Sequence, residues 1–246
     1  MDHMLYVVMS GASQTMLAQA ANTHNLANVN TTGFRADLAA FQSVPLTGPG
    51  LPSRIYAQAQ GNGVDLTPGA ILSTGRELDI AVNGPGWIAV QAADGAEAYT
   101  RAGDLRVSAN GFLETATGQK VLGNGGPIAL PPAEKMEIGA DGTISIRPLG
   151  QDVATLAVVD RIKLVAPPAE NLMKRADGLL GLQDGEVAAP DASVRILTGS
   201  LESSNVNAVE AMVNMITLAR QFEMQVKMMQ TAQNNDAAAT QMMQMS

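Results

Sequence analysis

The sequence contains no cysteine and only two histidines, His3 and His24. The absence of cysteine excludes disulfide bonds, zinc–thiolate sites and thiol catalysis together. Both histidines lie in the N-terminal segment, so a serine–histidine–aspartate arrangement or a histidine metal site has almost no residues to use. We therefore predict no catalytic residue, no metal ligand and no cofactor, and we expect that the protein is not an enzyme.

Basic and aromatic residues are also scarce. The formal net charge is −8 and the pI is near 4.7, with no basic cluster to offset the acidic excess. Such a chain is repelled by nucleic acid and by anionic lipid. Aromatic residues make up 3% of the chain, whereas there are 14 methionines, which favour adaptable aliphatic packing over an aromatic-lined pocket. Neither nucleic acid nor a small-molecule substrate is an expected partner.

Long apolar runs are missing as well. No segment approaches the roughly eighteen consecutive apolar residues that suggest a membrane span, so no membrane insertion is predicted. The opening residues Met1, Asp2 and His3 do not begin a secretory signal, which starts with basic residues followed by an apolar core. We expect a protein that stays in the cytoplasm or is exported by a route that removes no signal peptide.

The last forty or so residues predict a long amphipathic helix. Asn207 is the expected N-cap, and Glu210 would complete a capping box three residues later. Apolar residues then recur at steps of three and four, as in a helix that packs against a partner helix: Val209, Met212, Met215, Ile216, Ala219, Phe222, Val226 and Met229. Leu218, Met224 and Met228 lie off this stripe, so the helix has more apolar surface than one partner can cover.

The N-terminal segment, about residues 2–29, predicts the partner of that helix. It is rich in alanine, and its expected apolar face consists of Leu5, Val8, Met9, Ala12, Met16 and Leu26. Small side chains allow a close approach of two helices, and Asn28 to Gly33 would end the helix in a turn. The alternative is that both segments are core helices of an ordinary domain.

The middle of the chain differs from its helical ends in composition and pattern. Residues 36–75 contain several prolines and glycines and predict an extended connector with a short strand or two, or else a flexible solvated loop. From residue 76 to 199, short runs rich in Val, Ile and Thr alternate with turn dipeptides such as Asn83-Gly84, Asp94-Gly95, Asn110-Gly111 and Asp141-Gly142. This pattern favours an antiparallel sheet or a small barrel over βαβ units.

The predicted fold class is therefore α+β, with an antiparallel β-rich central domain flanked by paired N- and C-terminal amphipathic helices. The predicted division is an N-terminal helix and turn motif (1–35), a connector (36–75), a β-rich domain (76–199) and a C-terminal helix (200–246) that pairs with the first segment. An assembly role is predicted for these helix residues: Leu5, Val8, Met9, Ala12, Met16, Leu26, Val209, Met212, Ile216, Ala219, Phe222, Val226 and Met229.

Three blocks of the sequence resemble the bacterial flagellar axial proteins, the rod and hook family. The first is the run from Asn25 to Arg35, the second comprises 78–86, 99–103 and 118–123, and the third runs from Gly199 to Asn207 and continues to Lys227. The residues that carry the first and third motifs are Asn25, Leu26, Ala27, Asn28, Thr31, Gly33, Phe34, Leu201, Glu202, Ser204, Asn205 and Val206. The sequence departs from the family at Trp87 and Ile88, where two phenylalanines are often found.

The resemblance implies a structural subunit of the flagellar basal-body rod. Within the family, the first and last residues look most like those of a proximal-rod protein, and a distal-rod or hook paralogue is the alternative. The expected partners are neighbouring rod proteins, copies of the chain itself and the flagellar type III export apparatus, and the expected location is the rod within the periplasm. A β-rich binding module with a helical stalk is the alternative of another class.

Overall fold

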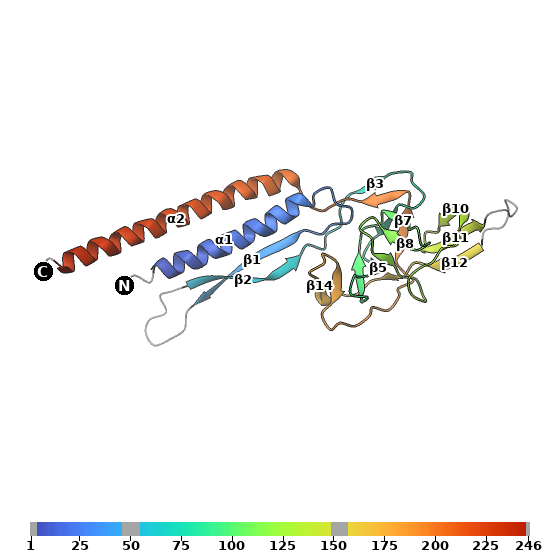
Figure 1. Ribbon diagram of the computed structural model, residues 1–246, viewed down its shortest axis with the longest axis horizontal. Coiled ribbons are helices and arrows are strands. Elements are labelled where there is room, and N and C mark those ends of the chain that lie inside the picture. The colour runs from blue at the N-terminus through green and yellow to red at the C-terminus, as the bar shows by residue number, and fades with distance from the viewer. Residues whose placement is uncertain (1–3, 46–54, 149–156, 245–246) are drawn as a thin grey trace. The chain divides into compact units, whose positions relative to one another are not determined.

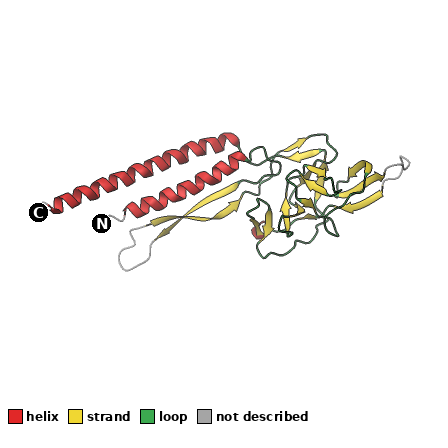
Figure 2. Ribbon diagram, viewed as in Figure 1, coloured by secondary structure: helices red, strands yellow, loops and turns green. Residues whose placement is uncertain are grey.

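The computed structural model describes residues 4–45, 55–148 and 157–244. The chain divides into two compact units. The helical unit takes in residues 1–29, 37–63 and 206–246, and the β unit takes in residues 30–36 and 64–205. The α-helices belong to the helical unit, and the β unit consists of strands, loops and the 3-10 helix η1 (Ala169–Asn171) (Figure 2).

The helical unit contains α1 (Met4–Ala27) and α2 (Ala208–Gln244), which lie side by side and run in opposite directions (Figure 1). Asn207 caps α2 as predicted, since its Oδ1 accepts hydrogen bonds from the backbone N–H groups of Val209 (3.0 Å) and Glu210 (3.4 Å). The side chain of Asn22 crosses between the helices and donates to the carbonyl of Ala211 (2.7 Å). In the described ranges, no helix has the length and apolar character that a membrane crossing requires.

Small residues form much of the seam between α1 and α2. In α1 the buried residues are Val8, Ala12, Thr15 and Ala18. In α2 one row of buried and half-buried residues recurs at steps of four and three, as in a coiled coil: Ala211, Met215, Leu218, Phe222, Gln225, Met229 and Ala232. The seam therefore has a coiled-coil period and includes one glutamine.

The segment predicted as a connector forms a hairpin. Strand β1 (Asp37–Pro45) pairs with β2 (Ile55–Val64) in a two-stranded sheet, and residues 46–54 lie outside the described ranges. The strands are longer than the expected short strand or two. Small residues such as Ala57, Ala59 and Gly61 occupy alternate positions of β2, so its period of two carries little contrast in hydrophobicity.

The β unit contains antiparallel sheets with short strands. The largest has the order β14-β15-β6-β5-β9-β8-β7, with β13 paired to β5, and a three-stranded sheet has the order β10-β11-β12. The remaining pairs are β16 with β4 and β17 with β3. The bounds are β3 (Ile71–Ser73), β4 (Ile80–Asn83), β5 (Trp87–Gln91), β6 (Glu97–Thr100), β7 (Leu105–Val107), β8 (Leu113–Thr115), β9 (Lys120–Val121), β10 (Ala133–Ile138), β11 (Thr143–Pro148), β12 (Ala157–Arg161), β13 (Leu164–Val165), β14 (Leu172–Lys174), β15 (Leu180–Leu182), β16 (Arg195–Thr198) and β17 (Ser200–Glu202).

Strand β5 lies at the centre of the β unit because both of its faces are buried. Ile88 and Val90 belong to the larger hydrophobic cluster, and Trp87 and Ala89 belong to a second cluster with Tyr99. The described strands form open sheets and no closed barrel, so of the two predicted architectures the sheet is confirmed. The predicted α+β class is also confirmed.

Candidate functional site

Three segments that are far apart in the sequence meet around one buried carboxylate in the β unit. Arg35 follows the turn after α1, Arg101 follows β6, and Glu202 ends β17. The Nη2 of Arg35 lies 2.6 Å from one carboxylate oxygen of Glu202, and the Nη1 of Arg101 lies 2.9 Å from the other. The exposed fractions of these side chains are 3%, 5% and 1%. We call this cluster the arginine–glutamate junction.

The junction is almost fully hydrogen-bonded. The backbone N–H of Gly69 also donates to Glu202 (2.8 Å), and Arg35 donates to the carbonyl of Thr67 (2.6 Å). Arg101 donates to the carbonyls of Val82 (3.2 Å) and Gly84 (2.7 Å). A buried ion pair is tolerated only when such additional bonds satisfy its polar atoms. These bonds tie the loop of residues 65–69 and strand β4 to the same centre.

Trp87 completes the junction. The guanidinium carbons of Arg101 and Arg35 lie 5.0 Å and 5.5 Å from the centre of its ring. The Nε atoms of both arginines are buried and have no hydrogen-bond acceptor among the described residues. The negative face of the indole offers these cations a partner where a polar one is missing, and tryptophan is the best aromatic residue for this role.

The junction contains two cations and one anion. Burial lowers the pKa of Arg101, the nearby carboxylate of Glu202 acts in the opposite direction, and the positive charge of Arg35 lowers it further. A carboxylate shared by two guanidinium groups in a dry interior is strongly held, because its removal would leave two buried charges without a counterion. This arrangement is a structural ion-pair cluster. Among the described residues it leaves no open position for a substrate.

Gly33 brings the N-terminal motif into contact with this centre. Its backbone N–H donates to the carbonyl of Glu202 (2.8 Å), and its φ of +66° lies in the region that favours glycine. A Cβ atom at this position would lie 2.2 Å from the carbonyl carbon of Arg101. Both the conformation and the close approach therefore require glycine.

Asn205 lies next to the junction and binds the same loop, since the carbonyl of Thr67 accepts from both Arg35 and Asn205. Its Oδ1 accepts from the N–H of Ala36 (2.8 Å), and its Nδ2 donates to the carbonyls of Asp65 (3.0 Å) and Thr67 (3.1 Å). The N–H of Asp65 donates in turn to the carbonyl of Ala36 (2.9 Å). Residues 36 and 205 end segments of the β unit and residue 64 begins one, so the side chain of Asn205 binds the chain at or next to three of its four crossings between the units.

Other motif residues act locally. In the helical unit, Asn25 binds both backbone groups of Asp37, at 2.8 Å and 2.9 Å, which fixes the start of β1 beside α1. Asn28 donates to the carbonyl of His24 (2.9 Å) at the end of α1. In the β unit, Ser204 is buried, and Leu201 is paired with Leu72.

The predicted assembly residues fall into two groups. Val8 and Ala12 are buried, and Leu5, Leu26, Ala219, Phe222, Val226 and Met229 are half-buried. Five others are 53–71% exposed in the single chain, so the pairing of α1 with α2 leaves most of their surface uncovered and their assembly role stays a prediction: Met9, Met16, Val209, Met212 and Ile216. The intrachain seam lies on the side of α2 that carries Ala211, Leu218 and Gln225.

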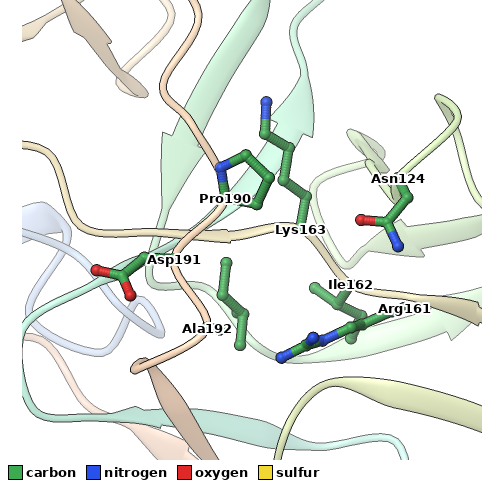
Figure 3. A pocket seen from close by; sticks show the side chains of 8 residues that line it. Asn124, Arg161, Ile162, Lys163, Pro190, Asp191 and Ala192 are labelled. Carbon is green, nitrogen blue, oxygen red and sulfur yellow. The ribbon is translucent and has the colours of Figure 1, made fainter.

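The described residues offer little for chemistry. A small pocket of about 80 Å³ is lined by Asn124, Arg161, Ile162, Lys163, Leu164, Pro190, Asp191 and Ala192 (Figure 3). Lys163 is engaged by Glu97 at 2.8 Å, the charged ends of Lys163 and Arg161 point apart, and the volume is below the ~300 Å³ of ordinary ligand pockets. Among the described side chains, no group of three or more His, Cys, Asp or Glu could hold a metal ion.

Three family models match the chain in separate segments. "Flagella basal body rod protein" matches residues 5–35, "Flagellar hook protein FlgE/F/G D1 domain" matches residues 81–146, and "Flagellar basal body rod FlgEFG protein C-terminal" matches residues 197–242. Each segment contributes one charged member of the junction: Arg35, Arg101 and Glu202.

Full-length relatives agree with these models. The flagellar basal-body rod protein FlgF of Salmonella typhimurium is 45% identical over 252 aligned residues that cover 100% of both chains. The chain belongs to the flagellar basal-body rod protein family. The FlgF of Escherichia coli K12 is 44% identical with the same coverage, and the rod protein FlgG of Agrobacterium fabrum is 32% identical over 90% of this chain and 91% of its own. The rod protein is thus FlgF-like, and the predicted membership is confirmed.

Sequence reasoning found the motifs but missed the junction. Arg35, Arg101 and Glu202 were recognised as parts of three blocks, yet their contact joins positions up to 167 residues apart. The available signal was the position of each charged residue inside a block that resembles the family. No period or spacing indicates that those blocks meet.

Proposed function

We propose that this rod protein is a structural subunit of the proximal flagellar rod that assembles helically with copies of itself and with neighbouring rod proteins. The observation that carries the proposal is the exposed apolar surface of the helical unit in a member of this family. On α1 this surface includes Met9, Met16 and Leu17, and on α2 it includes Val209, Met212, Val213 and Ile216, all more than half exposed.

The position of this surface supports contacts with other subunits. The intrachain seam already uses the opposite side of α2, where Ala211, Met215 and Leu218 lie. Residues such as Met212 and Ile216 therefore form a second apolar face, which remains in water in the single chain. A contiguous exposed apolar surface of this kind marks a protein–protein interaction site.

Charge favours partners of the same kind. The chain carries a net charge of −8, yet α1 contains no Asp, Glu, Lys or Arg, and α2 contains only Glu210, Arg220, Glu223, Lys227 and Asp236. Two helical units can thus approach each other with little of the repulsion that the rest of an acidic protein would cause. An uncharged apolar face is complementary to another uncharged apolar face.

The junction would give the β unit the rigidity that transmission of torque requires. Torque in the proposed rod passes through many contacts in parallel, because single surface contacts are weak. Arg35, Arg101 and Glu202 secure residues 30–36 and the segment before α2 to the β unit through buried bonds. In the proposed assembly the paired helices are the axial part, the hairpin of β1 and β2 contacts neighbours, and the β unit faces outward.

The remaining parts of the proposal follow from the family. We place the rod subunit in the periplasm and expect its export through the flagellar type III apparatus without removal of a signal peptide. No catalytic activity is proposed, and no cofactor.

A charge placed on the exposed face of α2 tests the proposal. In the variant with Met212→Asp and Ile216→Asp, the two lost side-chain burials correspond to about 3 to 6 kcal/mol of association free energy, which is a loss of more than about a hundredfold in association. We expect the variant to be a folded monomer by circular dichroism and to be absent from purified basal bodies of a complemented deletion strain, which would not swim.

The matched control carries Asn214→Asp and Gln221→Asp. Both of these residues are exposed polar residues of the same helix, so the control adds the same charge without removing apolar surface. It should enter the rod and restore swimming. Normal incorporation of the Met212/Ile216 variant would refute the role of this face, and failure of both variants would attribute the effect to charge alone.

A further inference from the structure

The seam between α1 and α2 contains one contact that is unlike the others. Gly11 is the only glycine in α1, and α2 contains none. A Cβ atom added to Gly11 would lie 3.2 Å from the Nε2 of Gln225, the glutamine on the seam of α2. A glycine inside a helix is destabilising relative to alanine, so its presence in an alanine-rich helix asks for a local reason.

Gln225 is as unusual in its position as Gly11. Its Oε1 is buried and has no hydrogen-bond partner among the described residues. A buried acceptor without a partner lowers stability, and leucine at this seam position would avoid that loss. Both helices therefore carry a locally unfavourable residue, and the two residues meet.

The alanines of the seam do little to select one alignment of the helices. Ala12, Ala18, Ala211 and Ala232 present similar small surfaces, and the coiled-coil spacing lets α2 slip by seven residues while the same face still points to α1. A slip of this size would move α2 by ~10 Å along its axis. It would also place Gln225 opposite a residue that has a Cβ atom.

We propose that the contact between Gln225 and Gly11 determines the register of α1 against α2. The amide packs closely where the opposing helix lacks a side chain, and against a Cβ atom the end of Gln225 would have to move by a few tenths of an ångström, so slipped alignments that are equally apolar are disfavoured. The hydrogen bond from Asn22 to the carbonyl of Ala211 (2.7 Å) holds the same alignment near the end of α1 and the start of α2, but another backbone carbonyl of α2 could accept it in a slipped alignment. A polar residue at one seam position is a known means of fixing the register of paired helices.

Register matters because it sets the position along α1 at which the exposed apolar face of α2 lies. Val209, Met212 and Ile216 would shift along α1 with any slip. The inference concerns the pairing of helices within one chain, and it stands or falls independently of the proposed place in the rod.

The absence of cysteine makes disulfide trapping a clean test. Ala18 lies four residues before Asn22, and Met215 lies four residues after Ala211, so the pair Ala18→Cys with Met215→Cys reports the observed antiparallel register. The pair Ala18→Cys with Phe222→Cys reports the slipped register, since a disulfide cannot bridge Cα atoms more than ~7 Å apart. Both pairs are introduced into the full-length chain, oxidised and separated by non-reducing electrophoresis.

With Gln225 and Gly11 intact, we expect the first pair to cross-link at least tenfold faster than the second. In the Gln225→Leu background, the second pair should gain rate until the ratio falls below about threefold, while the melting temperature of the cysteine-free Gln225→Leu protein stays the same or rises. The matched control is Gln221→Leu, which makes the same change at an exposed position of α2. It should leave the cross-linking ratio unchanged.

A double substitution checks the contact itself. Gly11→Ala should raise the melting temperature less in the parent chain than in the Gln225→Ala background, because the shortened side chain leaves room for the methyl group. The proposal is overturned if Gln225→Leu keeps the ratio of the parent chain, if the parent chain cross-links both pairs equally or neither, or if the two substitutions at 11 and 225 are simply additive.

Discussion

At the scale of single residues, the junction depends on Gly33, where both the backbone conformation and the lack of space exclude a side chain. Replacement by alanine would meet both a positive φ and the backbone of Arg101. We expect Gly33→Ala to lower the free energy of unfolding by about 2 to 4 kcal/mol, of which roughly 1 kcal/mol comes from the conformation and the rest from the displaced backbone. Urea denaturation of the purified chain measures this difference.

Gly178 is the matched control for that substitution. Its φ is +83°, and a Cβ atom there would meet nothing within 4 Å. Gly178→Ala should therefore show the conformational part alone. Equal losses at the two positions would contradict the close approach at the junction.

For two aspartates of the β unit we expect opposite effects of pH on the stability of the fold. Burial, with the negative charge of Asp79 adding to it, raises the pKa of Asp104. A raised carboxyl pKa means that the folded state binds the proton more tightly, so the ionised group lowers stability at neutral pH and this penalty disappears below the ordinary value of 3.8. Asp104→Asn should raise the melting temperature at pH 7, and the gain should vanish in acid.

For Asp141 the pKa shift, and therefore the effect of the ionised group on stability, has the opposite sign. Hydrogen bonds from the hydroxyl of Thr143 (2.7 Å) and from its N–H (3.1 Å) lower the pKa of Asp141. The ionised group therefore contributes stability above 3.8, and that contribution is lost as the pH falls through the lowered value. Asp141→Asn should reduce the melting temperature at pH 7 and have little effect in acid. Thermal scans at several pH values compare the two variants, and changes of the same sign would contradict these assignments.

At the scale of elements, turn chemistry was the most informative part of the sequence. The glycines of the dipeptides at residues 83–84, 94–95, 110–111 and 141–142 all adopt positive φ, and strands lie on either side of them. Strands such as β10 and β14 are harder to recognise in the sequence, because Ala133–Ile138 and Leu172–Lys174 mix polar and apolar residues without a clear alternation. Turn geometry is a local property, whereas pairing with a distant strand is not.

The helices were placed correctly, but the sequence did not separate the residues of their intrachain seam from those left exposed. Bulky apolar residues such as Met212 and Ile216 dominate any pattern ranked by hydrophobicity, so they were grouped with the seam residues in one assembly face. The structure buries Ala211 and Ala232 instead. When two faces of a helix are both apolar, periodicity alone does not indicate which face meets the partner of the same chain.

Helix α2 is expected to have unequal stability along its length. It has 37 residues against 24 in α1, and Ala232 is its last buried residue among the described side chains. In the purified monomer, amides after residue 235 should therefore exchange with solvent much faster than those between 211 and 229. Hydrogen-exchange mass spectrometry of the monomer and of isolated rods measures this. Uniform protection of α2 in the monomer would contradict the expectation.

At the scale of the whole molecule, the chain passes several times between the helical unit and the β unit, but the β unit has its own stabilising contacts. These are the arginine–glutamate junction and the hydrogen bonds of Asn205. A deletion of residues 206–246 retains Glu202 and Asn205, so we expect the β unit to unfold cooperatively with nearly unchanged stability. A deletion of residues 200–246 also removes strand β17 and leaves Arg35 and Arg101 without a buried counterion. This longer deletion should cost about 3 to 5 kcal/mol, which is a large part of the stability of an ordinary domain.

The two truncated chains differ by only six residues, so they form a matched pair. Urea unfolding followed by circular dichroism compares them. Neither chain should enter the rod, because both lack α2. Equal stability of the two would show that the junction is dispensable, and swimming of a strain that carries the shorter deletion would refute the role of α2.

Trp87, whose ring lies against both guanidinium groups of the junction, is the single tryptophan of the chain. The tryptophan fluorescence of the protein, excited selectively over that of its three tyrosines, consequently reports on one place only. An emission maximum that moves to longer wavelength would signal that solvent has reached the indole and that the junction has opened. The molecule thus carries its own optical indicator, with which detachment of either terminal motif can be timed without any added dye.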